Sequence, residues 1–126
     1  MNVLLDTHIA LWAIVDDPKL PKAAREMLLR PEVRVYTSTV SLWEIAVKHS
    51  LGKLPISSQY AQSAFNAAGF DSLPILPEHV TRTEELPWIH KDPFDRMLIA
   101  QALTEPMRLL TVDSKFGGYP GLIQLL

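Results

Sequence analysis

Two short apolar runs that each lead into an aspartate constrain the fold of this chain most strongly. Val3–Leu5 is followed by Asp6, and the segment RLLTV at 108–112 is followed by Asp113. Runs of this kind are typical of strands that are buried on both faces of a parallel sheet. Ligands bind outside the carboxyl ends of such strands, so we expect both aspartates to lie beside a binding site.

Helical segments separate these two runs from three further predicted strands. The three are RVYT at 34–37, SLPIL at 72–76 and, after the loop GGYPG, LIQLL at 122–126. Pro74 favours an edge position for the second of them, because proline cannot donate to a neighbouring strand. Thr7 is the expected N-cap of the first helix, and Asp92 and Pro93 are expected to begin a long one. This alternation predicts a three-layer α/β fold with a mainly parallel central sheet flanked by helices.

Composition narrows the class of protein. The 126 residues, 48% of them hydrophobic, suit one domain over residues 1–126 with its own core. The absence of cysteine excludes thiolate metal sites and thiol catalysis and suits the cytoplasm, where we expect the protein. No apolar run reaches the roughly 18 residues of a spanning helix, and the first residues lack the basic segment of a signal peptide, so no membrane association is expected.

The charge balance limits how the chain can bind nucleic acid. The net charge is −2, with 12 Lys and Arg against 14 Asp and Glu. Neutralisation of many phosphates by the protein alone is therefore excluded. Any contact with nucleic acid must come from a local patch or through metal ions.

Four acids stand out by their positions relative to the predicted strands and helices. They are Asp6, Glu44, Asp95 and Asp113. Each also has a purely structural interpretation. An Asp after a strand, such as Asp6 or Asp113, is often a turn residue or a helix cap. Glu44 can pair with Lys48 four residues on, and Asp95 can interact favourably with the dipole at the start of a helix.

The surroundings of the acids favour a metal site over these structural interpretations. Glu44 lies in the apolar stretch LWEIAV at 42–47, so its carboxylate is predicted to be partly buried, which is costly without a partner or a cation. Carboxylates that meet at one sheet edge repel each other, and Mg²⁺ or Mn²⁺ resolves that repulsion. The four histidines lack the spacing of a zinc site and are predicted to be surface or capping residues.

Four segments, in this order, carry a resemblance to a known family. They are LLDTHIALW, STVSLWEIAVK, HKDPFDRMLIAQA and LLTVDSKF. The chain resembles the PIN-domain toxins of the VapC type across its whole length. The resemblance implies a PIN-like domain whose metal-binding, catalytic acids are Asp6, Glu44, Asp95 and Asp113. It also matches hydroxyl positions of the family with Thr7 and Thr111.

The same resemblance implies an activity and partners. The expected activity is Mg²⁺- or Mn²⁺-dependent endonucleolytic cleavage of single-stranded or structured RNA, as the toxin of a type II toxin–antitoxin pair. The implied partners are a small antitoxin protein and a second copy of the chain, as a homodimer. Acids without a serine or histidine nucleophile suit metal-assisted hydrolysis of a phosphodiester. Arg96, next to Asp95, is predicted to be exposed or to pair with the acids, with contact to a phosphate as the second option.

Aromatic and basic residues near these segments have two interpretations each. Trp12, Trp43 and Trp88 can stack on bases, but Trp12 and Trp43 lie on apolar helical faces and are predicted to serve the core or an interface. Scattered lysines, Lys91 among them, can follow an RNA backbone but are interpreted as solvated charges.

Four other functions compete with a ribonuclease. A non-catalytic PIN-like module that binds RNA or a partner stays open, as does the same fold with single-stranded or flapped DNA as substrate. A phosphotransfer receiver is disfavoured because Asp6 stands alone after the first strand, without a second acid beside it. An aspartyl phosphatase of the Asp-x-Asp type is disfavoured because position 8 is histidine.

Overall fold

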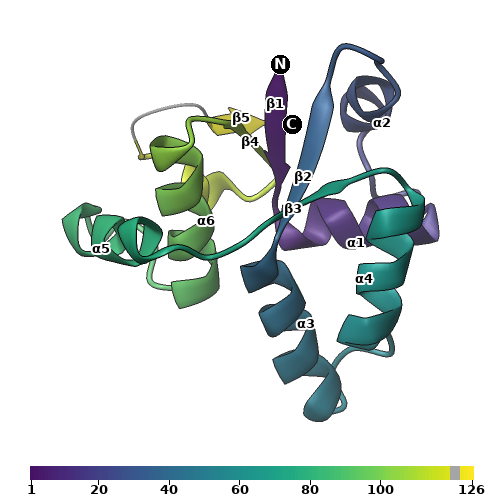
Figure 1. The fold of residues 1–126 in the computed structure, drawn as a ribbon, viewed down its shortest axis with the longest axis horizontal. Helices are drawn as coiled ribbons and strands as arrows, with labels where there is room; N and C mark the ends of the chain where they lie inside the picture. Colours follow the sequence, from purple (N-terminus) through teal and green to yellow (C-terminus); the bar gives the residue numbers. More distant parts are fainter. Residues whose placement is uncertain (120–122) are drawn as a thin grey trace.

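A central sheet of five parallel strands organises the chain (Figure 1). The computed structural model describes residues 1–119 and 123–126. In the spatial order β3-β2-β1-β4-β5, the strands are Asp71–Leu73, Arg34–Ser38, Asn2–Leu5, Arg108–Thr111 and Ile123–Leu125. Residues 120–122, which include the end of the predicted GGYPG loop and the first residue of the predicted last strand, lie outside the described residues. The predicted parallel sheet is confirmed.

Helices cover both faces of the sheet, which gives the predicted three layers. They are α1 (Thr7–Val15), α2 (Lys22–Leu28), α3 (Thr39–Ser50), α4 (Ser58–Ala67), α5 (Pro77–Glu85) and α6 (Pro93–Thr104), with a short 3₁₀ turn at Ser114–Phe116. Figure 1 shows α1, α2 and α4 on one side of the sheet and α5 and α6 on the other. Within the described part of the chain, no helix is long and apolar enough to cross a membrane.

The central strand β1 is apolar from Val3 to Leu5 because helices cover both of its faces there. Val3 and Leu5 point into one hydrophobic cluster, with residues of α1, α2 and α4. Leu4 points into the other, with residues of α6 and β4. All three side chains are completely buried. A strand covered on both faces has no position for a polar side chain until it ends at Asp6.

Two predicted element ends are corrected. The strand predicted at 72–76 is β3, and it ends at Leu73, before Pro74. Its predicted edge position is confirmed. The N-cap of α1 is Asp6 rather than Thr7, because Asp6 Oδ1 accepts a hydrogen bond from the backbone N–H of His8 (3.4 Å). This places Asp6 at a strand end and at a helix start at once.

The start of α6 is as predicted. Asp92 is its N-cap, and Asp92 Oδ1 accepts hydrogen bonds from the backbone N–H groups of Phe94 (2.8 Å) and Asp95 (3.1 Å). Pro93 occupies the first helical position, where its missing N–H has no helical partner to lose. The cap fixes Asp95 in the first turn of α6, at the carboxyl end of the sheet.

Candidate metal centre

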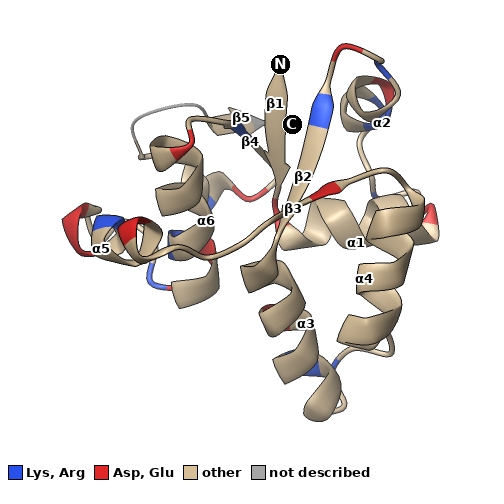
Figure 2. Cartoon of the chain, in the orientation of Figure 1, with Lys and Arg blue, Asp and Glu red and all other residues tan. Residues whose placement is uncertain are grey.

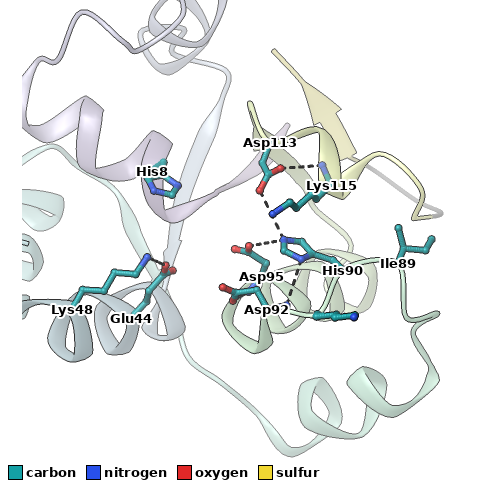
Figure 3. A pocket seen from close by; sticks show the side chains of 10 residues that line it. His8, Glu44, Lys48, Ile89, His90, Asp92, Asp95, Asp113 and Lys115 are labelled. Atoms are coloured by element: carbon teal, nitrogen blue, oxygen red, sulfur yellow. Dashed lines mark hydrogen bonds and ion pairs between the residues drawn. The ribbon is translucent and has the colours of Figure 1, made fainter. Parts of the chain in front are cut away.

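A cleft of about 470 Å³ opens at the carboxyl end of the sheet (Figure 3). Glu44 from α3, Asp95 from α6 and Asp113 after β4 line it. Asp6 is not part of its wall and is only 2% exposed. Figure 2 shows how acidic positions, drawn in red, occur at the ends of β1 and β4 and at the start of α6. Segments far apart in the sequence therefore bring acids to the same end of the sheet.

Asp95 lies in surroundings that disfavour its charge. Burial, the larger cause, and negative charges nearby together raise its pKa to about 8. The contributing carboxylates are Asp6, Asp92, Glu44 and Asp113. A carboxyl group with such a pKa is held in a site that disfavours its ionised form. A divalent cation would reverse this preference, because it supplies the opposite charge at the same place.

Asp6 is held by a hydroxyl from the neighbouring strand. Thr111 Oγ1 donates to Asp6 Oδ2 (2.7 Å) and accepts from the backbone N–H of Asp113 (3.0 Å). Burial raises the pKa of Asp6, and the hydrogen bond from Thr111 opposes that rise. Thr111 therefore links the acid that ends β1 to the acid that follows β4, and it fixes how these two segments sit relative to each other.

Thr7, the other hydroxyl position expected to support the site, faces α3 instead of an acid. Its Oγ1 lies 2.8 Å from Ser41 Oγ, and both side chains are buried. The pair joins the start of α1 to the helix that carries Glu44. The contact gives Thr7 a positioning role between the two helices.

Glu44 has one oxygen that is satisfied and one that is not. Its Oε2 accepts a hydrogen bond from Lys48 Nζ (2.6 Å), which is the pairing that the spacing allowed. Its Oε1 is buried and has no hydrogen-bond partner among the residues that the structure describes. Buried oxygens without a partner are rare and indicate a missing ligand or a site of strain. The oxygen is of the kind that Mg²⁺ and Mn²⁺ prefer.

Lys48 brings one positive charge to this wall of the cleft. Burial lowers its pKa, but the hydrogen bond and charge of Glu44, together with the charges of Asp92 and Asp95, outweigh burial and raise it overall. Lys48 is therefore fully protonated at neutral pH and offsets part of the acidic charge.

His90 is a site residue that the sequence did not predict. It was expected at the surface or as a cap, yet its side chain is 7% exposed and lines the cleft. Its Nε2 lies 2.7 Å from Asp95 Oδ2 and 3.8 Å from Asp113 Oδ2, and its Nδ1 accepts from the backbone N–H of Asp92 (3.4 Å). In the sequence, the position of His90 two residues before the helix cap Asp92 could have pointed to the site. Spacing typical of zinc ligands could not, because the site is built mainly from acids.

The other histidines divide between the two predictions. His8 and His49 are exposed, as expected. His79 does cap α5, since its Nδ1 accepts from the backbone N–H of Leu76 (3.0 Å), but the side chain is completely buried.

One ligand atom each from His90, Asp95 and Asp113 lies within 4.8 Å of the others, which is close enough to share one cation.

Arg96 is not where the sequence analysis placed it. It is 4% exposed, and no acid among the described residues pairs with it. Its guanidinium instead donates to backbone carbonyl oxygens of the last turn of α5 and of the segment between α5 and α6. These belong to Thr83 (2.8 Å), Leu86 (3.3 Å), Pro87 (3.0 Å) and His90 (3.3 Å). The expectation of an exposed or acid-pairing arginine was wrong, because the side chain points into the protein and the segment folds around it.

Comparisons with known proteins agree with this fold. The sequence matches the PIN domain family over residues 3–122. No curated protein matches it. The fold is similar to that of a chain in VapBC2 from Rickettsia felis bound to a DNA fragment from their promoter, with a TM-score of 0.73, 20% identity and coverage of 99% of this chain and 98% of that one.

Two further solved structures show the same likeness. A chain of DNA-bound VapBC from Salmonella typhimurium has a TM-score of 0.69 at 18% identity and covers 98% of this chain and 97% of its own length. A chain of VapBC-1 from nontypeable Haemophilus influenzae has a TM-score of 0.66 at 18% identity, with coverage of 99% and 98%. At this level of identity the likeness concerns the fold.

Proposed function

This chain belongs to the PIN domain family, and from that premise we propose that it is a metal-dependent endoribonuclease that acts as the toxin of a type II toxin–antitoxin pair. The observation that carries the proposal is the convergence of Glu44, Asp95 and Asp113 from separate segments on one cleft, with Asp6 buried outside its wall. Burial and the charges of the neighbouring carboxylates, that of Asp6 included, raise the pKa of Asp95 to about 8. A hydrophobic core does not need a cluster of acids, whereas metal-assisted hydrolysis of a phosphodiester does.

The acids suit Mg²⁺ or Mn²⁺ as the cofactor. Glu44, Asp95 and Asp113 would hold the cation from the wall of the cleft, and Asp6, oriented by Thr111, would be a fourth ligand. The donor set consists of carboxylate oxygens, and the unpartnered Oε1 of Glu44 fits it. A bound divalent cation stabilises the charge that develops on a phosphodiester and makes water a better nucleophile.

The chain's own residues would bind and orient the RNA. Lys48, Lys91 and Lys115 line the cleft, so their ammonium groups can contact phosphates on either side of the scissile bond. His90, with Nδ1 fixed by a backbone N–H, would hold the carboxylates of Asp95 and Asp113 in place.

Cleavage in the presence of Mn²⁺ tests the enzymatic part of the proposal. Purified protein is incubated with single-stranded and structured RNA, with Mg²⁺ or Mn²⁺ and with EDTA. We expect internal cuts that need the metal and stop in EDTA. Cleavage that persists in EDTA would exclude the metal mechanism, and binding of RNA without cleavage under all metal conditions would favour a non-catalytic PIN-like module.

The toxin role predicts a protein partner. The similar chains come from VapBC complexes, and an anionic cleft attracts an arginine side chain. We therefore propose that a small cognate antitoxin inserts a basic residue into this cleft. We further propose that the protein forms homodimers and acts in the cytoplasm. Co-expression with the neighbouring genes and purification of the chain tests the partner, and toxicity-free expression without any retained partner would contradict it.

A further inference from the structure

A second hollow lies beside the acidic cleft and differs from it in chemistry. It measures about 340 Å³ and is lined by residues of α3, α5, α6 and the segment between α5 and α6. Two tryptophans stand in its wall, Trp43 with 58% and Trp88 with 72% of its surface exposed. Side chains of this size are seldom left so exposed in a soluble protein unless they contact something.

Trp88 is held in place although it is exposed. The guanidinium carbon of Arg96 lies 3.7 Å from the centroid of the indole, which is a cation–π contact on one face of the ring. The same guanidinium binds the backbone carbonyls of Pro87 and His90, which flank Trp88 on either side. Arg96 thus fixes both the ring and the backbone that carries it, and the exposed remainder of the ring faces solvent.

Trp43 is fixed in a similar way from the opposite wall. It packs edge-on against Phe94, with ring centroids 5.0 Å apart and an interplanar angle of 79°. Its neighbour in the sequence is Glu44, which lines the acidic cleft. The aromatic hollow and the acidic cleft therefore share the helix α3 as a common wall.

A basic residue joins the two sites. Lys91 lines both the acidic cleft and the aromatic hollow. A single strand of RNA needs this combination, because its bases stack on aromatic rings while its phosphates need positive charge. A phosphodiester placed at the acids would have its next phosphate near Lys91 and the adjoining base near the two indoles.

We infer that the hollow between Trp43 and Trp88 is a nucleobase subsite, in which a base of single-stranded RNA next to the scissile phosphate stacks on Trp88. The inference rests on the proposed ribonuclease function and adds to it the part of the substrate that this surface binds. Arg96 is then a positioning residue, which explains why an arginine beside the acids points away from them and into the segment that carries Trp88.

Binding of a short, unstructured, fluorescein-labelled RNA that contains all four bases tests the subsite. Anisotropy is measured in an Asp95→Asn background, which prevents cleavage. Trp88→Ala should weaken binding about tenfold, within the range that base–aromatic stacking contributes, while Trp88→Phe should restore most of it. Tyr60→Ala is the matched control, because Tyr60 is an aromatic residue with 57% exposure that lies outside this hollow and should have no effect.

A series of RNAs with one abasic nucleotide distinguishes stacking from general loss of affinity. If a base stacks on Trp88, its removal and Trp88→Ala should each weaken binding, and the two together should weaken it no further. Fully additive losses at every position, or unchanged binding by Trp88→Ala, would overturn the subsite. A Trp88→Ala protein that binds RNA normally but changes from dimer to monomer would show that this surface is an interface between copies.

Failure of the subsite and failure of the proposed function give different results. If the unmodified protein cleaves RNA with Mn²⁺ while Trp88→Ala binds RNA as well as its parent, only the subsite is wrong. If the unmodified protein neither cleaves nor binds any RNA, both are wrong.

Discussion

Two buried polar clusters lie at the carboxyl end of the same sheet, and they differ in how their atoms are satisfied. In the first, Ser38 Oγ donates to Gln101 Oε1 (2.6 Å) and accepts from the backbone N–H of Val40 (3.0 Å), while Gln101 Nε2 donates to the carbonyl of Pro74 (3.2 Å). These side chains are neutral, buried and hydrogen-bonded. The cluster ties α3 to α6 and to the end of β3.

The second cluster, the acidic one, spans the same two helices but has the opposite character. Glu44 Oε1 is buried and has no hydrogen-bond partner among the residues described, and the pKa of Asp95 is raised to about 8 by burial and by neighbouring carboxylates. Burial of polar groups alone therefore does not identify a functional site. What distinguishes the acidic cluster is unsatisfied charge that the fold tolerates.

The largest effect is expected from removing one charge of the acidic cluster. Asp95→Asn should lower RNA cleavage at least about a hundredfold, because loss of a metal ligand should cost no less than loss of a residue that supports one. Gel-based cleavage with Mn²⁺ measures it. If Asp95→Asn keeps its activity, Asp95 only supports the start of α6, and the acidic cluster then has a structural role like that of the neutral one.

Breaking the neutral cluster should affect folding instead. Gln101→Leu leaves the hydroxyl of Ser38 and the carbonyl of Pro74 without their partner, so we expect the free energy of unfolding to fall by about 2–4 kcal/mol. Urea unfolding in EDTA measures it. Thr104→Ala is the control, because this half-buried hydroxyl only bonds back to the carbonyl of Ala100 and should cost little. A Gln101→Leu protein of unchanged stability would contradict the structural role.

The pH dependence of metal-free stability sharpens the contrast further. The pKa of Asp95 is about 8 in the folded protein against an ordinary value of 3.8, so the protonated form favours folding. That contribution is complete below about pH 4 and is lost as the pH rises toward 8. The stability gained by Asp95→Asn in EDTA should therefore be small at pH 4 and grow up to pH 8. A gain in stability that is the same at both pH values would show that ionisation of Asp95 does not destabilise the folded protein.

The smallest effect is expected at the helix cap. Asp92→Asn keeps a side chain that accepts hydrogen bonds from the first turn of α6, so we expect stability to change by about 0.5 kcal/mol or less and cleavage to be nearly unaffected. Urea unfolding and the cleavage assay measure both. A strong loss of cleavage with normal stability would mean that Asp92 belongs to the acidic cluster as a functional member.

The sequence predicted the parts of the fold and site that depend on local pattern. The apolar run before Asp6, the Asp92–Pro93 helix start and the edge position signalled by Pro74 are visible in one segment each, and the structure confirms them. The burial of Glu44 was also predictable, because its neighbours in α3 are apolar.

What could not be predicted depends on contacts between distant segments. Arg96 was assigned by its position next to Asp95, but the loop that follows α5 offers it carbonyl oxygens, and this decides the direction of its side chain. His90 enters the site because the Asp92 backbone and Asp113, far along the chain, meet around it. Neither arrangement leaves a periodic pattern in the sequence.

If the acidic cluster binds a cation, repulsion among its carboxylates lowers the stability of the metal-free protein and the cation removes that cost. The most direct test is the free energy of unfolding of the unmodified protein and of Asp95→Asn, each in EDTA and in Mn²⁺ at pH 7. We predict that Mn²⁺ strongly stabilises the unmodified protein, that Asp95→Asn is the more stable of the two in EDTA, and that Mn²⁺ adds little to it. An Asp95→Asn protein that is less stable in EDTA and gains as much stability from Mn²⁺ as the unmodified protein would contradict a cation-binding role of Asp95 in the acidic cluster.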